Sequence, residues 1–243
     1  MNKENILQIA SLVDLTTLSD TDSKTHIQQI VETANRGIAG IKPASVCVYS
    51  NFSNELAQLD PSIKKAVVAG YFPSGQATIQ LKQNELTLLN ELDVDEIDFV
   101  INKGEITSNN FEYLRNELDM ARATVPNKCL KIILETGILT QEQISKAAQI
   151  AIDCKVDFLK TSTGKLAVGA TVSAAEIFAH QIKRFNATTG IKISGGIRTI
   201  ETAEQYITIL GDILGKSFIH PKTLRIGASS LFTNLADAYE KDD

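Results

Sequence analysis

The sequence contains no tryptophan and few aromatic residues, cysteines or histidines. Aromatic residues make up only 6% of its 243 residues, so we expect a core built mostly from Val, Ile, Leu and Ala, which suits parallel strands covered by helices on both faces. The cysteines Cys47, Cys129 and Cys154 are odd in number and far apart, without a C-x-x-C pair, and there are only three histidines. This scarcity predicts a reduced protein with no disulfide framework and no metal site.

Long apolar runs and clusters of basic residues are missing as well. No run of about 18 or more apolar residues occurs, so we expect neither a membrane span nor a signal peptide. The net charge is −5 and the pI about 5.3, and no group of Lys and Arg residues is present that would neutralise nucleic-acid phosphates. These absences favour a cytoplasmic protein that has no nucleic-acid or membrane partner.

Short apolar runs alternate along the chain with longer segments of helical period, which is typical of repeated βα units around a parallel sheet. Eight strands are expected, at Leu12–Leu15, Ser45–Val48, Ala66–Ala69, Glu96–Ile101, Leu130–Leu134, Phe158–Lys160, Ile191–Ser194 and Leu224–Ile226. No repeat or Pro/Gly/Ser-rich linker divides the chain. The pattern therefore predicts an α/β fold, a single-domain (β/α)₈ TIM barrel over residues 1–243.

The segments between these strands carry helix signals. The first has apolar residues at i, i+3, i+4 and i+7, namely Ile27, Ile30, Val31 and Ala34. Two others have the spacing of a capping box, Thr140 with Gln143 and Ser173 with Glu176. In such a box the two side chains bond free backbone amides at the helix start, so helices are expected to begin there.

Charged residues interrupt three of the apolar strands near their carboxyl ends, where barrel enzymes have their active sites. They are Asp98 in DEIDFVIN, Lys160 in DFLKTSTGK and Lys192 in IKISGGIRT. Side chains alternate along a strand. If the apolar neighbours of these three residues point outward against the helices, all three charged side chains point into the barrel. Each alone is as well explained by a solvated rim charge or a structural ion pair; the three together favour a site.

Two lysines point to amine chemistry, since an ε-amine is nucleophilic only when it is neutral. The expected strands of Lys160 and Lys192 are neighbours, so their amines should lie roughly 6 Å apart, where repulsion at a dielectric near 20 lowers a pKa by about two units. Partial desolvation lowers it further. Asp98 can hold a water or move a proton. The residues alone leave open which lysine is the nucleophile.

The turns after the last strands suggest a phosphate site, because they combine glycines with a helix start that offers unpaired amides. Candidate contacts are Thr163, Gly164, Gly195, Gly196, Ser229 and Ser230. A glycine pair alone is more often a turn than a ligand site. Its place beside paired lysines favours phosphate binding.

These segments resemble the deoxyribose-phosphate aldolase family over nearly the whole chain. The similar segments are LVDLTTL, SVCVY, YFPSG, DEIDFVIN, ILETGIL, DFLKTSTGK, IKISGGIRT and RIGASSL. The resemblance implies a class I aldolase without a cofactor that reversibly cleaves 2-deoxy-D-ribose 5-phosphate, in deoxyribose breakdown, to acetaldehyde and D-glyceraldehyde 3-phosphate. It implies Lys160 as the Schiff-base lysine, Lys192 as the neighbouring ammonium and Asp98 as the acid/base or water-holding residue. Lys165 and Asp14 would support phosphate binding, although Lys165 can equally be a rim charge.

Family members of the similar subgroup have a longer tail with a C-terminal tyrosine that assists proton transfer. The nearest counterpart, Tyr239, is better explained as a surface residue of the last helix, and Cys47 as a buried structural thiol. Two alternatives remain: another Schiff-base barrel aldolase, such as a transaldolase, and a non-catalytic barrel that binds a sugar phosphate. The family resemblance further suggests a homodimer.

Overall fold

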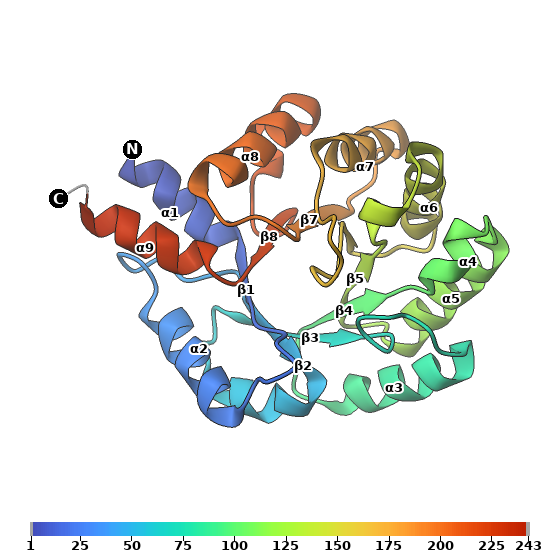
Figure 1. Cartoon of the computed structure of the whole chain (residues 1–243), viewed down its shortest axis with the longest axis horizontal. Coiled ribbons are helices and arrows are strands. Elements are labelled where there is room, and N and C mark those ends of the chain that lie inside the picture. Colours follow the sequence, from blue (N-terminus) through green and yellow to red (C-terminus); the bar gives the residue numbers. More distant parts are fainter. Residues whose placement is uncertain (1, 242–243) are drawn as a thin grey trace.

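A computed structural model describes residues 2–241, in which eight parallel strands pair in chain order and close into a barrel (Figure 1). Each strand bonds to the next, and β8 bonds to β1. The strands are β1 (Val13–Thr16), β2 (Ser45–Tyr49), β3 (Lys64–Ala69), β4 (Glu96–Val100), β5 (Cys129–Ile133), β6 (Phe158–Lys160), β7 (Gly190–Ser194) and β8 (Leu224–Ala228). The predicted TIM barrel is confirmed, and every strand lies within two residues of its expected bounds.

The helices surround the barrel, and α1 and α9 lie side by side near the two ends of the chain (Figure 1). They are α1 (Lys3–Leu12), α2 (Lys24–Arg36), α3 (Ile79–Glu91), α4 (Lys103–Thr107), α5 (Phe111–Thr124), α6 (Gln141–Asp153), α7 (Val172–Phe185), α8 (Ile200–Leu214) and α9 (Leu231–Lys241). Short 3₁₀ helices are η1 (Ser50–Gln58), which connects β2 to β3, η2 (Thr136–Ile138) and η3 (Lys216–Phe218). None of the helices in residues 2–241 is long and apolar enough to cross a membrane.

One of the two predicted capping boxes is present and the other is wrong. At α6 the Thr140 side chain accepts from the Gln143 amide at 3.2 Å, and the Gln143 side chain accepts from the Thr140 amide at 3.0 Å. At α7 the cap is Thr171, whose hydroxyl accepts from the Ala174 amide. Ser173 already lies inside this helix, because Thr171 can adopt the extended backbone that a cap requires two residues earlier.

The two faces of the barrel strands differ in chemistry. Outward side chains such as Ile97 and Phe99 are fully buried in one large apolar core with the helices. Inward, β2 and β3 contribute a small apolar cluster of Cys47, Ala66 and Val68. The remaining strands contribute charged side chains inside the barrel, and these position the site.

Candidate active site

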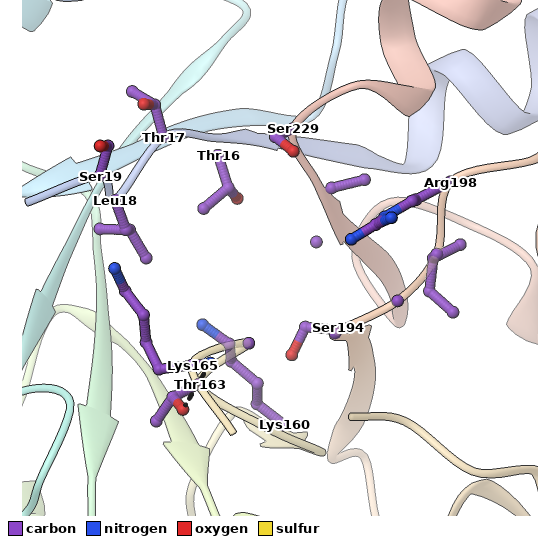
Figure 2. A pocket seen from close by; sticks show the side chains of 16 residues that line it. Thr16, Thr17, Leu18, Ser19, Lys160, Thr163, Lys165, Ser194, Arg198 and Ser229 are labelled. Atoms are coloured by element: carbon purple, nitrogen blue, oxygen red, sulfur yellow. Dashed lines mark hydrogen bonds between the residues drawn. The ribbon is translucent and has the colours of Figure 1, made fainter. Parts of the chain in front are cut away.

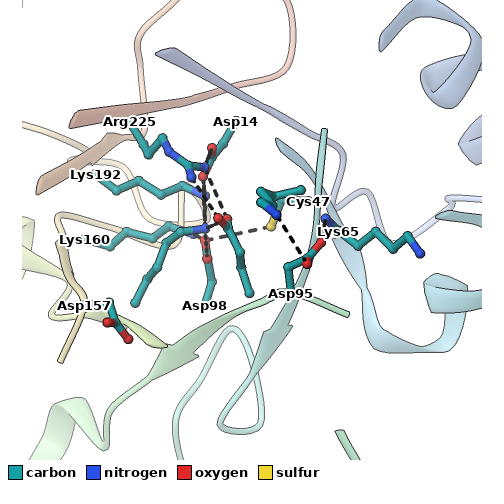
Figure 3. Close-up of polar contacts among 12 residues, drawn as sticks. Asp14, Cys47, Lys65, Asp95, Asp98, Asp157, Lys160, Lys192 and Arg225 are labelled. Atoms are coloured by element: carbon teal, nitrogen blue, oxygen red, sulfur yellow. Dashed lines mark hydrogen bonds and ion pairs between the residues drawn. The ribbon is translucent and has the colours of Figure 1, made fainter. Parts of the chain in front are cut away.

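Seven charged side chains fill the barrel interior, drawn from every strand except β2 and β3 (Figure 3). We call them the interior network. Each is at most 5% exposed, and a buried charge is tolerated only when it is paired and hydrogen-bonded. Its members are Asp14 of β1, Glu96 and Asp98 of β4, Lys131 of β5, Lys160 of β6, Lys192 of β7 and Arg225 of β8.

Asp98 joins the three lysines of this network. Its Oδ2 accepts from Lys160 Nζ at 2.6 Å and from Lys192 Nζ at 2.7 Å, and its Oδ1 accepts from Lys131 Nζ at 3.1 Å. Lys160 and Lys192 pair directly across β6 and β7. The sequence-based expectation that Asp98, Lys160 and Lys192 meet inside the barrel is thus confirmed in geometry.

Asp14 and Glu96 bind Arg225 and also contact lysines that Asp98 binds. Asp14 lies 2.6 Å from Lys192 Nζ, 2.6 Å from Arg225 Nη1 and 3.2 Å from Lys131 Nζ. Glu96 accepts from Arg225 Nη2 at 2.8 Å and also from Lys131. Among residues 2–241 there is no cluster of His, Cys, Asp and Glu that could hold a metal ion; the interior carboxylates bind ammonium and guanidinium groups.

The network keeps most of its members charged. Burial by itself raises the pKa of Asp14 and Asp98, but the surrounding Lys131, Lys192 and other cations outweigh it and hold both pKa values well below the usual range. Burial lowers the pKa of Lys131 and Lys192, but Asp14 and Asp98 outweigh it, so both pKa values are raised. Asp14, Asp98, Lys131 and Lys192 are therefore ionised at neutral pH.

Lys160 is the exception, because its pKa is lowered. Burial is the main cause, the attraction of Asp98 opposes it, and the repulsion of Lys192 adds to it. The sequence-based reasoning gave Lys192 the leading part and desolvation the lesser one. That order was wrong, because alternation alone shows neither how completely the amine is buried nor that Asp98 bonds it directly.

A pocket of about 360 Å³ opens above Lys160 at the carboxyl ends of the strands (Figure 2). Lys165 and Arg198 approach it from opposite sides, and the amine end of Lys160 lies between them (Figure 2). The lining residues are Thr16, Thr17, Leu18, Ser19, Lys160, Thr163, Gly164, Lys165, Ser194, Gly195, Gly196, Ile197, Arg198, Gly227, Ala228 and Ser229. The pocket thus has a buried amine at one end and cations, hydroxyls and glycines around it.

Most of the predicted site residues line this pocket. Those on its wall are Lys160, Thr163, Gly164, Lys165, Gly195, Gly196 and Ser229. Asp98 and Lys192 lie behind Lys160 in the interior network. The structure places Asp14 in that network too, where it faces Lys192, Lys131 and Arg225 and not the pocket, and Ser230 is exposed beside the wall without lining it.

Sequence reasoning missed Arg198, which lines the pocket, and Lys131, Glu96 and Arg225, which complete the network. Lys131 and Arg225 stand between apolar neighbours in CLKII and LRIGA, so the alternation that placed Lys192 inward was a usable signal for them. Arg198 follows the glycine pair in a turn, where no periodicity predicts a direction.

Gly195 and Gly196 differ in what surrounds them, although both have positive φ, +91° and +88°. A Cβ on Gly195 would lie 2.4 Å from Ser162 Oγ and 2.9 Å from Gly169 Cα. A Cβ on Gly196 would meet no atom within 4 Å. Gly195 therefore allows the loops after β6 and β7 to touch, whereas Gly196 leaves its backbone open toward the pocket.

Cys47 is buried and Tyr239 lies on the last helix, as the sequence predicted. Cys47 is fully buried, its Sγ lies 3.8 Å from Asp98 Oδ2, and burial raises the pKa of its thiol to about 11. Tyr239 lies on α9, where Lys3 Nζ is 4.7 Å from its ring centroid, and it does not line the pocket. This placement favours the reading of Tyr239 as a residue of the helical layer.

The comparisons with known proteins agree with this geometry. The DeoC/LacD family aldolase profile matches residues 8–231, so the chain belongs to this family of aldolases. Deoxyribose-phosphate aldolase of Homo sapiens is 33% identical over 251 residues, which cover 95% of this chain and 79% of the human protein.

Solved structures show the same barrel. QR15, an aldolase, is 27% identical with a TM-score of 0.79, and 96% of each chain is covered. The tetrameric deoxyribose phosphate aldolase from Aeropyrum pernix has a TM-score of 0.72 at 22% identity, with 100% of both chains covered. At that identity the second likeness shows the shared fold.

Proposed function

We propose that this enzyme reversibly cleaves 2-deoxy-D-ribose 5-phosphate to acetaldehyde and D-glyceraldehyde 3-phosphate, with Lys160 as the Schiff-base lysine. The observation that carries the proposal is the Lys160 amine. It is the one cation of the interior network whose pKa is lowered, and it is the one member of that network that lines the pocket. An amine that is neutral near pH 7 can attack a carbonyl. The human relative, a deoxyribose-phosphate aldolase, supports the choice of substrate.

The reaction proceeds through covalent steps on this amine. Lys160 Nζ adds to the aldehyde carbon C1 of the open-chain sugar, and the carbinolamine loses water to give a protonated Schiff base. Removal of the C3 hydroxyl proton then breaks the C2–C3 bond, and the bonding electrons pass toward the iminium nitrogen to form an enamine. Glyceraldehyde 3-phosphate leaves, C2 gains a proton, and addition of water releases acetaldehyde and restores the amine.

Asp98 and Lys192 support these steps in different ways. Asp98 is ionised and 2.6 Å from Lys160 Nζ, so it can accept a proton or orient a water during carbinolamine formation. Lys192 keeps its charge, since its pKa is raised, and it shares the same Asp98 oxygen. Its positive charge disfavours protonation of Lys160.

The wall of the pocket suits the phosphate. Lys165 and Arg198 supply positive charge from opposite sides, and glycine backbones at Gly164, Gly195 and Gly196 allow an anion to approach amides. Ser229 adds a hydroxyl, and α9 begins two residues later with its positive dipole end. Ser230 and Asp14 are expected to act indirectly, through the start of α9 and through Lys192.

Borohydride trapping tests this proposal. Incubation with acetaldehyde and borohydride, followed by peptide mapping, should place a reduced two-carbon unit on Lys160, and the Lys160→Met variant should lose both the label and the cleavage of deoxyribose 5-phosphate. Label on Lys192 or Lys131 would overturn the assignment of the nucleophile. Label without cleavage of this sugar phosphate would favour another Schiff-base aldolase such as a transaldolase. If neither label nor cleavage is observed, the alternative of a non-catalytic barrel that binds a sugar phosphate is favoured.

The proposal also includes the cellular location and the oligomeric state of the enzyme. Three free cysteines and a phosphorylated substrate suit a cytoplasmic enzyme. The homodimer stays a prediction, since the Aeropyrum relative is tetrameric. Light scattering after size exclusion measures the mass of the assembly directly.

A further inference from the structure

Glu135 is a buried carboxylate outside the interior network. It lies two residues after the end of β5 and is 0% exposed, and its backbone is left-handed, with φ 55° and ψ 55°. A residue with a Cβ is rarely held in this conformation unless its surroundings determine it, and such residues gather at functional sites. The contacts of Glu135 show what holds it there.

Both carboxylate oxygens bind the loop after β6. Glu135 Oε1 accepts from the Thr163 amide at 3.1 Å, and Oε2 accepts from Thr163 Oγ1 at 2.6 Å. The Thr163 hydroxyl in turn accepts from the Lys165 amide at 3.2 Å. One carboxylate thus fixes the backbone of Thr163, Gly164 and Lys165, three consecutive residues of the pocket wall.

Glu135 also connects this loop to residues that follow β3 and β4. Its Oε2 lies 3.4 Å from Lys103 Nζ at the start of α4, and Lys103 donates to the Pro73 carbonyl at 2.8 Å. Pro73 belongs to the loop after β3. The Glu135 side chain therefore links the loops that follow β3, β4 and β6, while its own backbone belongs to the loop after β5.

The side chain of Glu135 lies outside the pocket, because it is not among the lining residues and its donors enclose it. We propose that Glu135 is a positioning residue for the phosphate end of the substrate, acting through Thr163 to hold Gly164 and Lys165 in their binding geometry. This inference rests on the proposed function, since it assumes that Gly164 and Lys165 contact the substrate phosphate.

Glu135→Gln tests the inference with little change in shape. A glutamine has one acceptor oxygen and places an NH₂ group where the second carboxylate oxygen accepted from Thr163 Oγ1 and Lys103 Nζ. The loop after β6 should loosen at its phosphate contacts while Lys160, on β6 itself, stays in place. For deoxyribose 5-phosphate we expect KM to rise about tenfold, with kcat changed less than about threefold. For unphosphorylated 2-deoxyribose, kcat/KM should change less than about twofold.

Two further variants complete the experiment. Thr163→Val keeps the shape of the side chain but removes the hydroxyl that connects Glu135 to the Lys165 amide, so it should reproduce the selective rise in KM. Glu85→Gln is the matched control: this carboxylate accepts from the Gly70 and Tyr71 amides in the loop after β3 and has no contact with the loop after β6. It should leave the ratio of kcat/KM values for the two substrates unchanged.

The outcomes separate the inference from the proposed function. If the wild-type enzyme cleaves neither substrate, the proposed function fails. If the wild-type enzyme cleaves both and Glu135→Gln reduces kcat/KM equally for both, or if Glu85→Gln gives the same selective loss, Glu135 is a structural residue only and the inference is overturned. The inference is supported if KM for deoxyribose 5-phosphate rises selectively in Glu135→Gln and in Thr163→Val but not in Glu85→Gln.

Discussion

Replacing Lys192 with leucine should raise the pKa of Lys160 and move the pH profile of the enzyme. Both amines bond Asp98 Oδ2, at 2.6 and 2.7 Å, so they lie at most about 5 Å apart. At an effective dielectric near 20 their repulsion is then at least about 3 kcal/mol, or about two pKa units. The variant also leaves Asp98 with one cation fewer, which strengthens its attraction for a proton on Lys160. Both effects raise the pKa; water entering the space offsets part of them.

The direction of the change in the profile follows from which form of Lys160 reacts. In the proposed mechanism the neutral amine of Lys160 is the nucleophile. Activity should then be lost as the pH falls through the pKa of Lys160, and the acidic limb of kcat/KM should report that pKa in the free enzyme. In Lys192→Leu this limb should move up by about two pH units. Activity at pH 7 should fall by up to roughly 100-fold and be largely regained at higher pH.

Two companion variants identify the cause. Lys192→Arg keeps the charge and should hold the limb near its wild-type position while lowering the maximum rate, because the guanidinium is bulkier. Asp98→Asn removes the anion that favours a proton on Lys160, so it should move the limb to lower pH. A limb that stays at the wild-type pH in Lys192→Leu, while activity falls at every pH, would refute the electrostatic reasoning and favour Lys192 as a proton donor or a substrate contact.

Three further results are expected. On the hypothesis that unsaturated condensation products of acetaldehyde reach the buried Cys47 thiol, Cys47→Met should lengthen survival in concentrated acetaldehyde, and with a thiol pKa of about 11 wild-type inactivation should quicken as the pH rises. Equal inactivation rates in the two proteins would rule out that hypothesis. In thermal melts, Gly195→Ala should destabilise the protein by about 1–3 kcal/mol more than Gly196→Ala, because only the first adds a methyl group against Ser162. Arg198→Met should raise KM for deoxyribose 5-phosphate by about tenfold or more and leave KM for unphosphorylated deoxyribose unchanged, whereas an equal rise for both substrates would contradict a phosphate contact.

Repetition of βα units made the fold predictable from sequence. Each strand is a short apolar run between helical segments, so its position is set locally, and eight such units in one domain favour closure. Exact ends were less certain; Leu12, for instance, ends α1, where an apolar residue fits helix and strand equally well. The error at Ser173 has the same origin, because two hydroxyl residues near the start of α7 can each serve as its cap.

The candidate active site was predictable as far as it depends on strand alternation. Asp98, Lys160 and Lys192 each interrupt an apolar strand, and a period of two residues fixes the side to which they point. The contacts of the full interior network depend on which inward side chains lie at the same height along the barrel axis. This height is set by the register between neighbouring strands, which strand alternation does not give. Glu135 and Lys103 lie outside the strands, and their contacts come from residues 28 and 30 positions away, so no local pattern indicated them.

The charge balance of the barrel interior links folding to catalysis. Among residues 2–241 the interior network has the four basic side chains Lys131, Lys160, Lys192 and Arg225 against the three carboxylates Asp14, Glu96 and Asp98. Their formal charges sum to zero when Lys160 is the group that has lost its proton, and this is the form that the proposed mechanism requires.

In the proposed mechanism, formation of the protonated Schiff base adds one positive charge to this interior, and the substrate phosphate in the pocket supplies negative charge nearby. Cleavage of the C2–C3 bond turns the iminium into a neutral enamine, so this positive charge is removed as glyceraldehyde 3-phosphate departs. Protonation of C2 restores a positive iminium with no phosphate beside it, and hydrolysis then returns the interior to neutrality.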